Sequence, residues 1–179
     1  MRENFKLPEG FTLIEMIVYV AIVAVLVLVI AAFAVWAIQI GSKTRINYEL
    51  ADNARRAMEK MVYEIKNSKT IYTPVSIFET SPGQLSLEQA TTSIPGETAT
   101  FVDFFKCGNA LCEKKEGQTP QALTNERVKL TSLKFFQLLN STTTPSVQIS
   151  LKLEPAASST RPEYAGSLEL INTVTLRSY

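Results

Sequence analysis

A long apolar segment near the N-terminus constrains this chain most. Residues 16–38 contain no charged side chain and no amide, and 14 of these 23 residues are Leu, Ile, Val or Phe. As an α-helix the segment extends over roughly 35 Å, which is enough to cross a bilayer core of about 30 Å. Its many β-branched residues disfavour helix in water, but a lone span in lipid must satisfy its own backbone hydrogen bonds. The segment therefore predicts a transmembrane helix.

One carboxylate, Glu15, directly precedes this segment. An ionisable group inside a membrane segment is costly and commonly marks a function, with a partner for its charge. Two interpretations stay open on position alone. Either Glu15 reaches the lipid headgroups at the end of an ordinary single-pass anchor, or its carboxylate has a specific partner.

The residues around Glu15 resemble the processing motif of type IV prepilins and pseudopilins. Gly10-Phe11-Thr12-Leu13-Ile14-Glu15 follows a short charged leader and precedes the apolar segment. The resemblance implies that a prepilin peptidase cleaves between Gly10 and Phe11 and then methylates the new N-terminus at Phe11. It also implies that Glu15 acts in assembly by pairing with the Phe11 amine of a neighbouring subunit. Two buried charges are each costly alone and offset each other best when paired.

The same resemblance implies a location and a set of partners. We expect a single-pass protein of the bacterial cytoplasmic (inner) membrane, with an extracytoplasmic C-terminal domain and a place in surface filaments. Expected partners are other pilin or pseudopilin subunits, prepilin peptidase, membrane lipid, and an inner-membrane assembly platform whose ATPase acts in trans. The chain has no G-x-x-x-x-G-K-[ST] loop of its own. Its 18 basic and 17 acidic residues predict no strong attraction to nucleic acid.

The pattern of residues divides the chain into four parts. Residues 1–10 are the leader, 11–40 the transmembrane half of a helix, 41–73 its amphipathic half, and 74–179 a β-rich globular domain. An unbroken helix from Thr12 to Asn67 has a length of about 84 Å. One apolar stripe is predicted on the amphipathic half, formed by Ile46, Leu50, Ala54, Met58, Met61 and Ile65. The pairs Asp52–Arg56 and Lys60–Glu64 are predicted on its solvent-facing side.

After Pro74 the sequence changes to short alternating runs separated by turn residues. Pro155–Ser167 is predicted as an exposed loop. The predicted strands are Ile77–Glu79, Gln84–Glu88, Thr98–Lys106, Leu111–Lys115, Arg127–Leu139, Val147–Leu153 and Leu168–Leu176. Burying both apolar faces predicts an α+β fold, in which the long N-terminal helix packs on an antiparallel β-sheet, as in pilins.

Cys107 and Cys112 flank the predicted turn at Gly108-Asn109. On the two arms of a hairpin they could face each other, so a disulfide formed in an oxidising extracytoplasmic space is one interpretation. Two free thiols are the other. The pair lies in the middle of the chain, so the C-terminal disulfide loop of many type IV pilins is absent.

No catalytic, cofactor-binding or metal site is predicted. The chain has no His and only two Asp, Asp52 and Asp103, so neither the commonest metal ligand nor a carboxylate cage for calcium is evident. This counts against the calcium-binding major pseudopilins. Lys114-Lys115, between Glu113 and Glu116, is interpreted as a solvated strand edge.

The resemblance favours a structural subunit, most like a minor pilin or a J-type minor pseudopilin. Unlike many pilins, the chain has no Pro in its apolar half. A non-polymerising, single-pass membrane-anchored binding module remains an alternative, as does a pseudopilin of a DNA-uptake machine. A membrane-anchored enzyme lacks residues that would carry its chemistry. The choice between pilus, secretion system such as type II secretion, and DNA uptake stays open.

Overall fold

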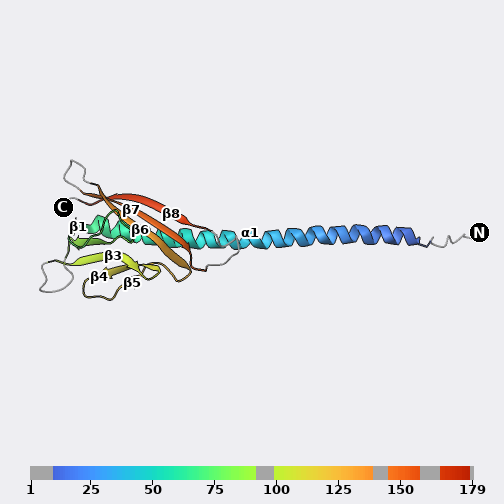
Figure 1. The fold of residues 1–179 in the computed structure, drawn as a ribbon, viewed down its shortest axis with the longest axis horizontal. Coiled ribbons are helices and arrows are strands. Elements are labelled where there is room, and N and C mark those ends of the chain that lie inside the picture. The colour runs from blue at the N-terminus through green and yellow to red at the C-terminus, as the bar shows by residue number, and fades with distance from the viewer. Residues whose placement is uncertain (1–9, 92–98, 139–144, 158–165, 178–179) are drawn as a thin grey trace, which may run out of the picture. The chain divides into compact units, whose positions relative to one another are not determined.

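The computed structural model describes residues 10–91, 99–138, 145–157 and 166–177. Within these ranges the chain forms one helix and eight strands, so the predicted α+β fold class is confirmed (Figure 1). The elements are α1 (Leu13–Asn67), β1 (Ser68–Ile71), β2 (Leu85–Gln89), β3 (Phe101–Cys107), β4 (Ala110–Lys115), β5 (Gln121–Ala122), β6 (Val128–Leu138), β7 (Ser146–Pro155) and β8 (Leu168–Thr175). The chain divides into two compact units after Ser42.

The N-terminal unit contains the apolar part of α1. Its large hydrophobic side chains are exposed throughout, from Leu13 at 79 % to Ile38 at 70 %. An 18-residue window of the helix has a mean hydropathy of 3.2, and by length and composition the helix can cross a membrane. Such a surface is unfavourable in water and favourable in lipid. These properties fit a membrane-anchored, single-pass protein.

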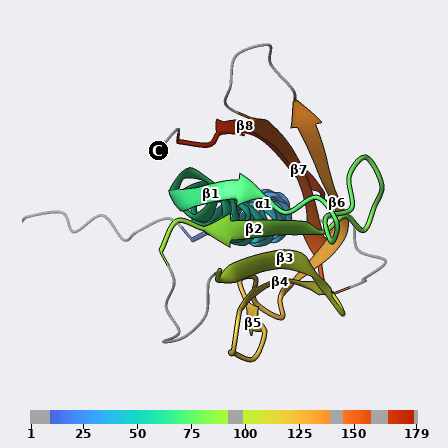
Figure 2. The ribbon, with the colours of Figure 1, turned by 90° about the vertical axis from the view of Figure 1, so that its left-hand side faces the viewer.

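The C-terminal unit contains two antiparallel sheets around the amphipathic half of α1 (Figure 2). One sheet has the strand order β1-β2-β3-β4-β5, and the other has the order β6-β7-β8. The sequence analysis predicts one sheet, and the segment between β1 and β2 explains the difference. Its backbone N–H groups at Glu79 and Gly83 donate to the carbonyl groups of Phe135 and Leu133 in β6, each at 2.8 Å. A looped segment therefore lies beside β6 where a further strand would continue the sheet.

Gly83 makes this close contact sterically acceptable. A Cβ at this position would lie 3.1 Å from Cδ2 of Phe135 and 3.2 Å from the carbonyl oxygen of Leu133. Both distances are shorter than ordinary van der Waals contact. A side chain at position 83 would therefore force Phe135 or the backbone of β6 to shift.

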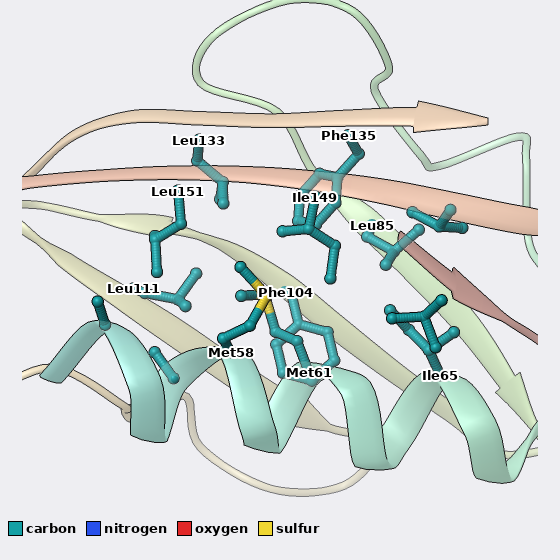
Figure 3. Close-up of a cluster of buried hydrophobic side chains, with 14 of the residues drawn as sticks. Met58, Met61, Ile65, Leu85, Phe104, Leu111, Leu133, Phe135, Ile149 and Leu151 are labelled. Carbon is teal, nitrogen blue, oxygen red and sulfur yellow. The ribbon is translucent and has the colours of Figure 1, made fainter. Parts of the chain in front are cut away.

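The core lies between the amphipathic half of α1 and both sheets. Met58, Met61 and Ile65 point from α1 toward side chains of the strands, among them Phe104 and Phe135 (Figure 3). The predicted stripe is confirmed, because Leu50, Ala54, Met58, Met61 and Ile65 are buried and Ile46 packs against them partly buried. Each large side chain buried here contributes about 1.5–3 kcal/mol.

The end predicted for an unbroken helix, Asn67, is confirmed, but residues 68–73 of the predicted amphipathic half, 41–73, are not helical. The helix ends at Asn67, and Ser68–Ile71 forms β1, which pairs with β2. Ser68 donates its hydroxyl to the carbonyl of Ile65 at 2.6 Å, which satisfies one terminal helix acceptor. Pairing with a strand distant in sequence decides this boundary, and local propensity does not reveal it.

The other strand predictions are close to the observed bounds. Ile77–Glu79 is reduced to an isolated bridge between Ile77 and Gln84, and the two-residue β5 has no counterpart in the sequence analysis. Parts of three predictions lie outside the described residues: Thr98, Leu139, and residues 158–165 of the predicted loop.

We expect Met61→Ala to lower the free energy of unfolding of the C-terminal unit by about 2–5 kcal/mol, because the fully buried side chain leaves a cavity. Chemical denaturation of the full chain in detergent micelles, followed by Tyr and Trp fluorescence, measures this. Tyr48→Ala is the control, since Tyr48 is 72 % exposed and its loss should change stability by less than about 0.5 kcal/mol. Equal effects of the two substitutions would contradict the assigned core.

Candidate processing and assembly site

Local sequence determines where α1 begins. The backbone N–H of Glu15 donates to the carbonyl of Thr12 at 3.1 Å and lies 3.4 Å from Thr12 Oγ1, and the N–H of Met16 donates to the same carbonyl at 3.2 Å. Thr-x-x-Glu is the pattern of a capping box, in which a side-chain oxygen accepts from an otherwise unpaired N–H. A carboxylate in the first turn also interacts favourably with the helix dipole. The helix start therefore needs no support from the β-rich domain.

The carboxylate of Glu15 has one neighbouring donor on its own helix. The hydroxyl of Tyr19, one turn further on, donates to Glu15 Oε1 at 3.4 Å. The ring of Tyr19 also meets the ring of Phe11 edge to face, with centroids 6.4 Å apart. A carboxylate has about four acceptor positions, so Glu15 can still accept hydrogen bonds from another molecule.

Gly10 and Phe11, between which the sequence predicts cleavage, are both exposed. Among the described residues, leaving out the chain neighbours of Gly10, no atom lies within 4 Å of the place where a Cβ would stand on it. The described part of the fold therefore imposes no steric requirement for glycine at this position. Residues 1–9 of the predicted leader lie outside the described residues.

Cys107 and Cys112 are joined by a disulfide across the β3–β4 hairpin. Their Cα atoms are 5.8 Å apart, and Cys112 is buried. Gly108, in the turn between them, has a φ of 61°, which a residue without Cβ adopts readily. The bond closes a short loop, so it stiffens the hairpin locally and constrains little of the remaining chain.

Four charged side chains connect α1 with β4, and we call them the α1–β4 charge cluster: Lys60, Glu64, Glu113 and Lys115. Lys60 Nζ lies 2.7 Å from Glu64 Oε1 and 3.4 Å from Glu113 Oε1. Lys115 Nζ lies 3.2 Å from Glu64 Oε1 and 3.9 Å from Glu113 Oε1. Each carboxylate therefore faces the same two ammonium groups, but Glu64 is the closer to both.

The two carboxyl groups of this cluster respond oppositely to their surroundings. Burial raises the pKa of Glu113, and the lysines, at longer distances, do not reverse this effect. Burial acts in the same direction on Glu64, but hydrogen bonds from Lys60 and Lys115 outweigh it and lower the pKa of that carboxyl. For Lys60, desolvation is the largest single influence and lowers the pKa of the ammonium, but the hydrogen bonds and attraction from Glu64 and Glu113 together outweigh it, so this pKa is raised.

This cluster corrects one prediction. Glu64 is predicted on the solvent-facing side of the helix, and this is wrong because Glu64 is 4 % exposed. Glu113, whose burial the sequence did not indicate, is 6 % exposed, whereas Lys114 of the predicted solvated strand edge is exposed. Glu64 lies next to the stripe residue Ile65 on α1, and strand β4 covers the Glu64 side chain. The other predicted pair, Asp52–Arg56, is an exposed ion pair as expected.

No group of three or more potential metal ligands occurs among the described residues. In the same ranges, the buried side-chain atoms without a hydrogen-bond partner, on Gln89, Asp103 and Glu113, are dispersed over β2, β3 and β4. Within the described part of the N-terminal unit, the groups at this site are those of Gly10, Phe11, Thr12, Glu15 and Tyr19. What they offer is an exposed peptide bond, a capped helix start and a carboxylate with spare acceptor capacity.

Comparison with known proteins bears on this N-terminal site. Residues 8–31 match the family model described as the prokaryotic N-terminal methylation motif. The matched residues include Gly10, Phe11 and Glu15 and stop well before the β-rich domain. No curated protein and no solved structure matched the chain. The match supports a type IV pilin or pseudopilin type of chain, which implies processing by prepilin peptidase and assembly with other pilin subunits.

The α1–β4 charge cluster predicts opposite results for two neutral substitutions. Since the pKa of Glu64 is lowered by folding, its carboxylate stabilises the fold above its unfolded pKa, and that stability is lost as pH falls through the folded pKa. Glu64→Gln should therefore lower the free energy of unfolding by about 1.5–3 kcal/mol at pH 7, and by less at pH 4. Denaturation of the full chain in detergent at both pH values measures this.

Glu113→Gln is the matched control. Because folding raises the pKa of Glu113, its ionised form is disfavoured in the fold, and the penalty grows as pH rises through the unfolded pKa toward the folded one. Removing this charge should leave stability at pH 7 unchanged or increased. A loss at pH 7 as large as that of Glu64→Gln would show that both carboxylates are stabilising and contradict the assignment.

Proposed function

We propose that this chain is a structural subunit of a type IV pilus-like filament, a minor pilin or a minor pseudopilin. The observation that carries the proposal is one arrangement: an exposed Gly10–Phe11 bond, a helix capped at Thr12, and Glu15 at the start of an uninterrupted apolar helix. The match of residues 8–31 to the N-terminal methylation motif supports it. The disulfide in the middle of the chain, without a C-terminal disulfide loop, favours a minor subunit.

In this proposal, cleavage after Gly10 by prepilin peptidase creates a charged amine at Phe11, which is then methylated. This amine and the Glu15 carboxylate lie at the same end of the apolar helix, where lipid or packed helices surround them. The amine of one subunit then donates to the spare acceptor positions of Glu15 in the next. Because each charge alone is costly to bury, the pair favours one axial register between neighbouring helices.

The remaining parts of the chain have consistent roles. The transmembrane half, residues 11–40, holds the subunit in the inner membrane and packs with neighbouring helices in the filament core. The amphipathic half of α1, which ends at Asn67, and the β-rich domain that follows it lie on the extracytoplasmic side. Extraction from the membrane requires work, and an assembly platform with its own ATPase supplies it.

Mass spectrometry of native cells tests the proposal. We expect the peptide that begins at Phe11 to be cleaved, N-methylated and present in the sheared filament fraction in a small amount relative to other subunits. Its presence as the dominant subunit would make the chain a major pilin. Processed chain confined to membranes favours a pseudopilin of a secretion system. A chain that retains residues 1–10 in mature cells would falsify the proposal and leave a membrane-anchored binding module.

Glu15→Gln tests the assembly role separately from processing. We expect the variant to be cleaved at Gly10 as efficiently as the parent, but to enter filaments at least about tenfold less, because an unpaired buried amine remains. Tyr19→Phe is the matched control, since it removes the hydroxyl that donates to Glu15 and keeps the carboxylate. Normal incorporation of Glu15→Gln would mean that its charge has no role in assembly.

A further inference from the structure

The two sheets have four outer edges within the described ranges, formed by β1, β5, β6 and β8. An outer strand exposes unpaired N–H and C=O groups, and proteins generally protect such edges from other strands. Two of the four are protected by their length. β5 has two residues. β1 has four residues and carries Lys69, which pairs with Glu88 at 2.8 Å.

The outer edge of β6 is covered by other parts of the chain. Carbonyl groups of Leu133 and Phe135 accept from the segment between β1 and β2 at 2.8 Å. The N–H of Leu130 donates to the carbonyl of Asn109 at 2.7 Å. A register shift between Leu130 and Ser132 further interrupts the strand. An incoming strand therefore finds little free backbone along β6.

β8 has none of these protections. It has eight residues, Leu168–Thr175, and it pairs with β7 in an unbroken register without a bulge. The strand contains no Pro, Lys or Arg, and its outward-facing Ile171 is 60 % exposed. Its one charged residue, Glu169, accepts a hydrogen bond from Ser150 of β7 at 2.9 Å, so this carboxylate is held against the sheet and not over its edge. Among the described residues, β7 is its one hydrogen-bonded neighbour. Over about 27 Å, alternate residues of β8 therefore direct their N–H and C=O groups away from the sheet.

An apolar groove lies between α1 and β8. Its volume is about 440 Å³, and Met58, Val62, Tyr63 and Leu170 provide its apolar lining. A strand added beside β8 would place every second side chain over this groove, because successive side chains alternate between the faces of a sheet. The groove thus requires apolar side chains at alternate positions of its occupant.

The charges at the groove indicate one further property of the occupant. The lining includes two basic residues, Arg55 and Lys66, and one acidic residue, Glu59. Arg55 Nε lies 2.7 Å from Glu59 Oε1, so these two charges satisfy each other. Lys66 has no ion pair among the described residues and leaves a net positive charge. An acidic side chain facing Lys66 complements it.

A second copy of β8 does not fit these requirements. An antiparallel pair of β8 strands would direct the two amphipathic halves in opposite ways, whereas chains inserted in one membrane by one process share a direction. A parallel pair, related by a two-fold axis along the strands, keeps one direction but turns the outward face of the second copy over the groove. That face carries Glu169, Ile171, Thr173 and Thr175, so it offers one large apolar side chain where the groove requires them at alternate positions. The other outer edges of a second copy are short or covered, as described above. The occupant must therefore be a strand of a different polypeptide.

We propose that the free edge of β8 binds an extended strand of another polypeptide in the same assembly. The strand carries apolar side chains at alternate positions, which enter the groove, and a carboxylate that faces Lys66. Main-chain hydrogen bonds extend the three-stranded sheet, and the side chains give specificity. The inference rests on the proposed function only in that both chains belong to one membrane assembly. Shared anchoring raises their effective concentration, so a contact of one strand suffices.

Site-specific photocrosslinking of the full chain in native cells tests this inference. A photoreactive phenylalanine replaces Asn172, which is exposed and lines the groove, and in a control it replaces Lys69 on the protected edge of β1. We expect the Asn172 position to crosslink to one defined segment of a different polypeptide, at least about tenfold above the Lys69 position. That segment should have alternating apolar residues and an acidic residue. Lys66→Glu should reduce the crosslink about tenfold, and Lys129→Glu, an exposed charge reversal on β6, should not.

Other results overturn the inference. Crosslinks no stronger than at Lys69, crosslinks only to lipid, or crosslinks to a second copy of this chain would each exclude a strand of a different polypeptide at β8. A crosslink that Lys66→Glu leaves unchanged would exclude the proposed charge contact. The Phe11 N-terminal peptide, measured in the same cells, separates the two proposals. Processed chain without a β8 crosslink overturns this inference alone, and unprocessed chain overturns the proposed function.

Discussion

The fold of the C-terminal unit depends on burial of one apolar stripe on α1. Met58, Met61 and Ile65 contact side chains of both sheets, and neither sheet alone covers them. Two-sided coverage explains why the strands form separate sheets around the helix. The segment that contains Gly83 packs closely against β6 and connects the two sheets through its backbone hydrogen bonds.

The same helix carries a second apolar surface that this chain does not bury. From Leu13 to Ile38 the side chains are exposed in every direction, so no single contact face is defined within one molecule. Lipid satisfies such a surface without specificity, and only polar groups can then specify a register. Glu15 is the one carboxylate in this part of α1, so its charge is the strongest polar determinant of how this part of the helix can pair with another molecule.

Much of this arrangement is predictable from the sequence, because it depends on local periodicity. The apolar segment, the stripe from Ile46 to Ile65, and the alternation in β7 each follow from side-chain spacing alone. The capping pattern Thr12-x-x-Glu15 is also local and could have been recognised from four residues. A family resemblance, and not geometry, is what points to cleavage after Gly10.

What sequence reasoning missed depends on contacts between distant residues. Glu64 lies four residues after Lys60, a spacing that is equally compatible with an exposed ion pair on the helix surface. Only the position of β4 shows that Glu64 is buried together with Glu113. β1 follows the helix without a turn signal, because its pairing with β2 determines it. The unprotected edge of β8 becomes apparent only when every other edge has been accounted for, which requires the complete strand order.

The contact between Tyr19 and Glu15 has a consequence for a subunit that waits in the membrane. The Tyr19 hydroxyl donates a weak hydrogen bond to the Glu15 carboxylate, so this carboxylate keeps one hydrogen-bond partner while it is surrounded by lipid. In the proposed assembly, the amine of a neighbouring subunit would replace this neutral donor with a charged one. The free energy gained on joining would then be the difference between the two donors, not the full cost of burying an unpaired charge. Under that proposal a subunit would persist as a membrane-anchored monomer and still be stabilised by joining a filament.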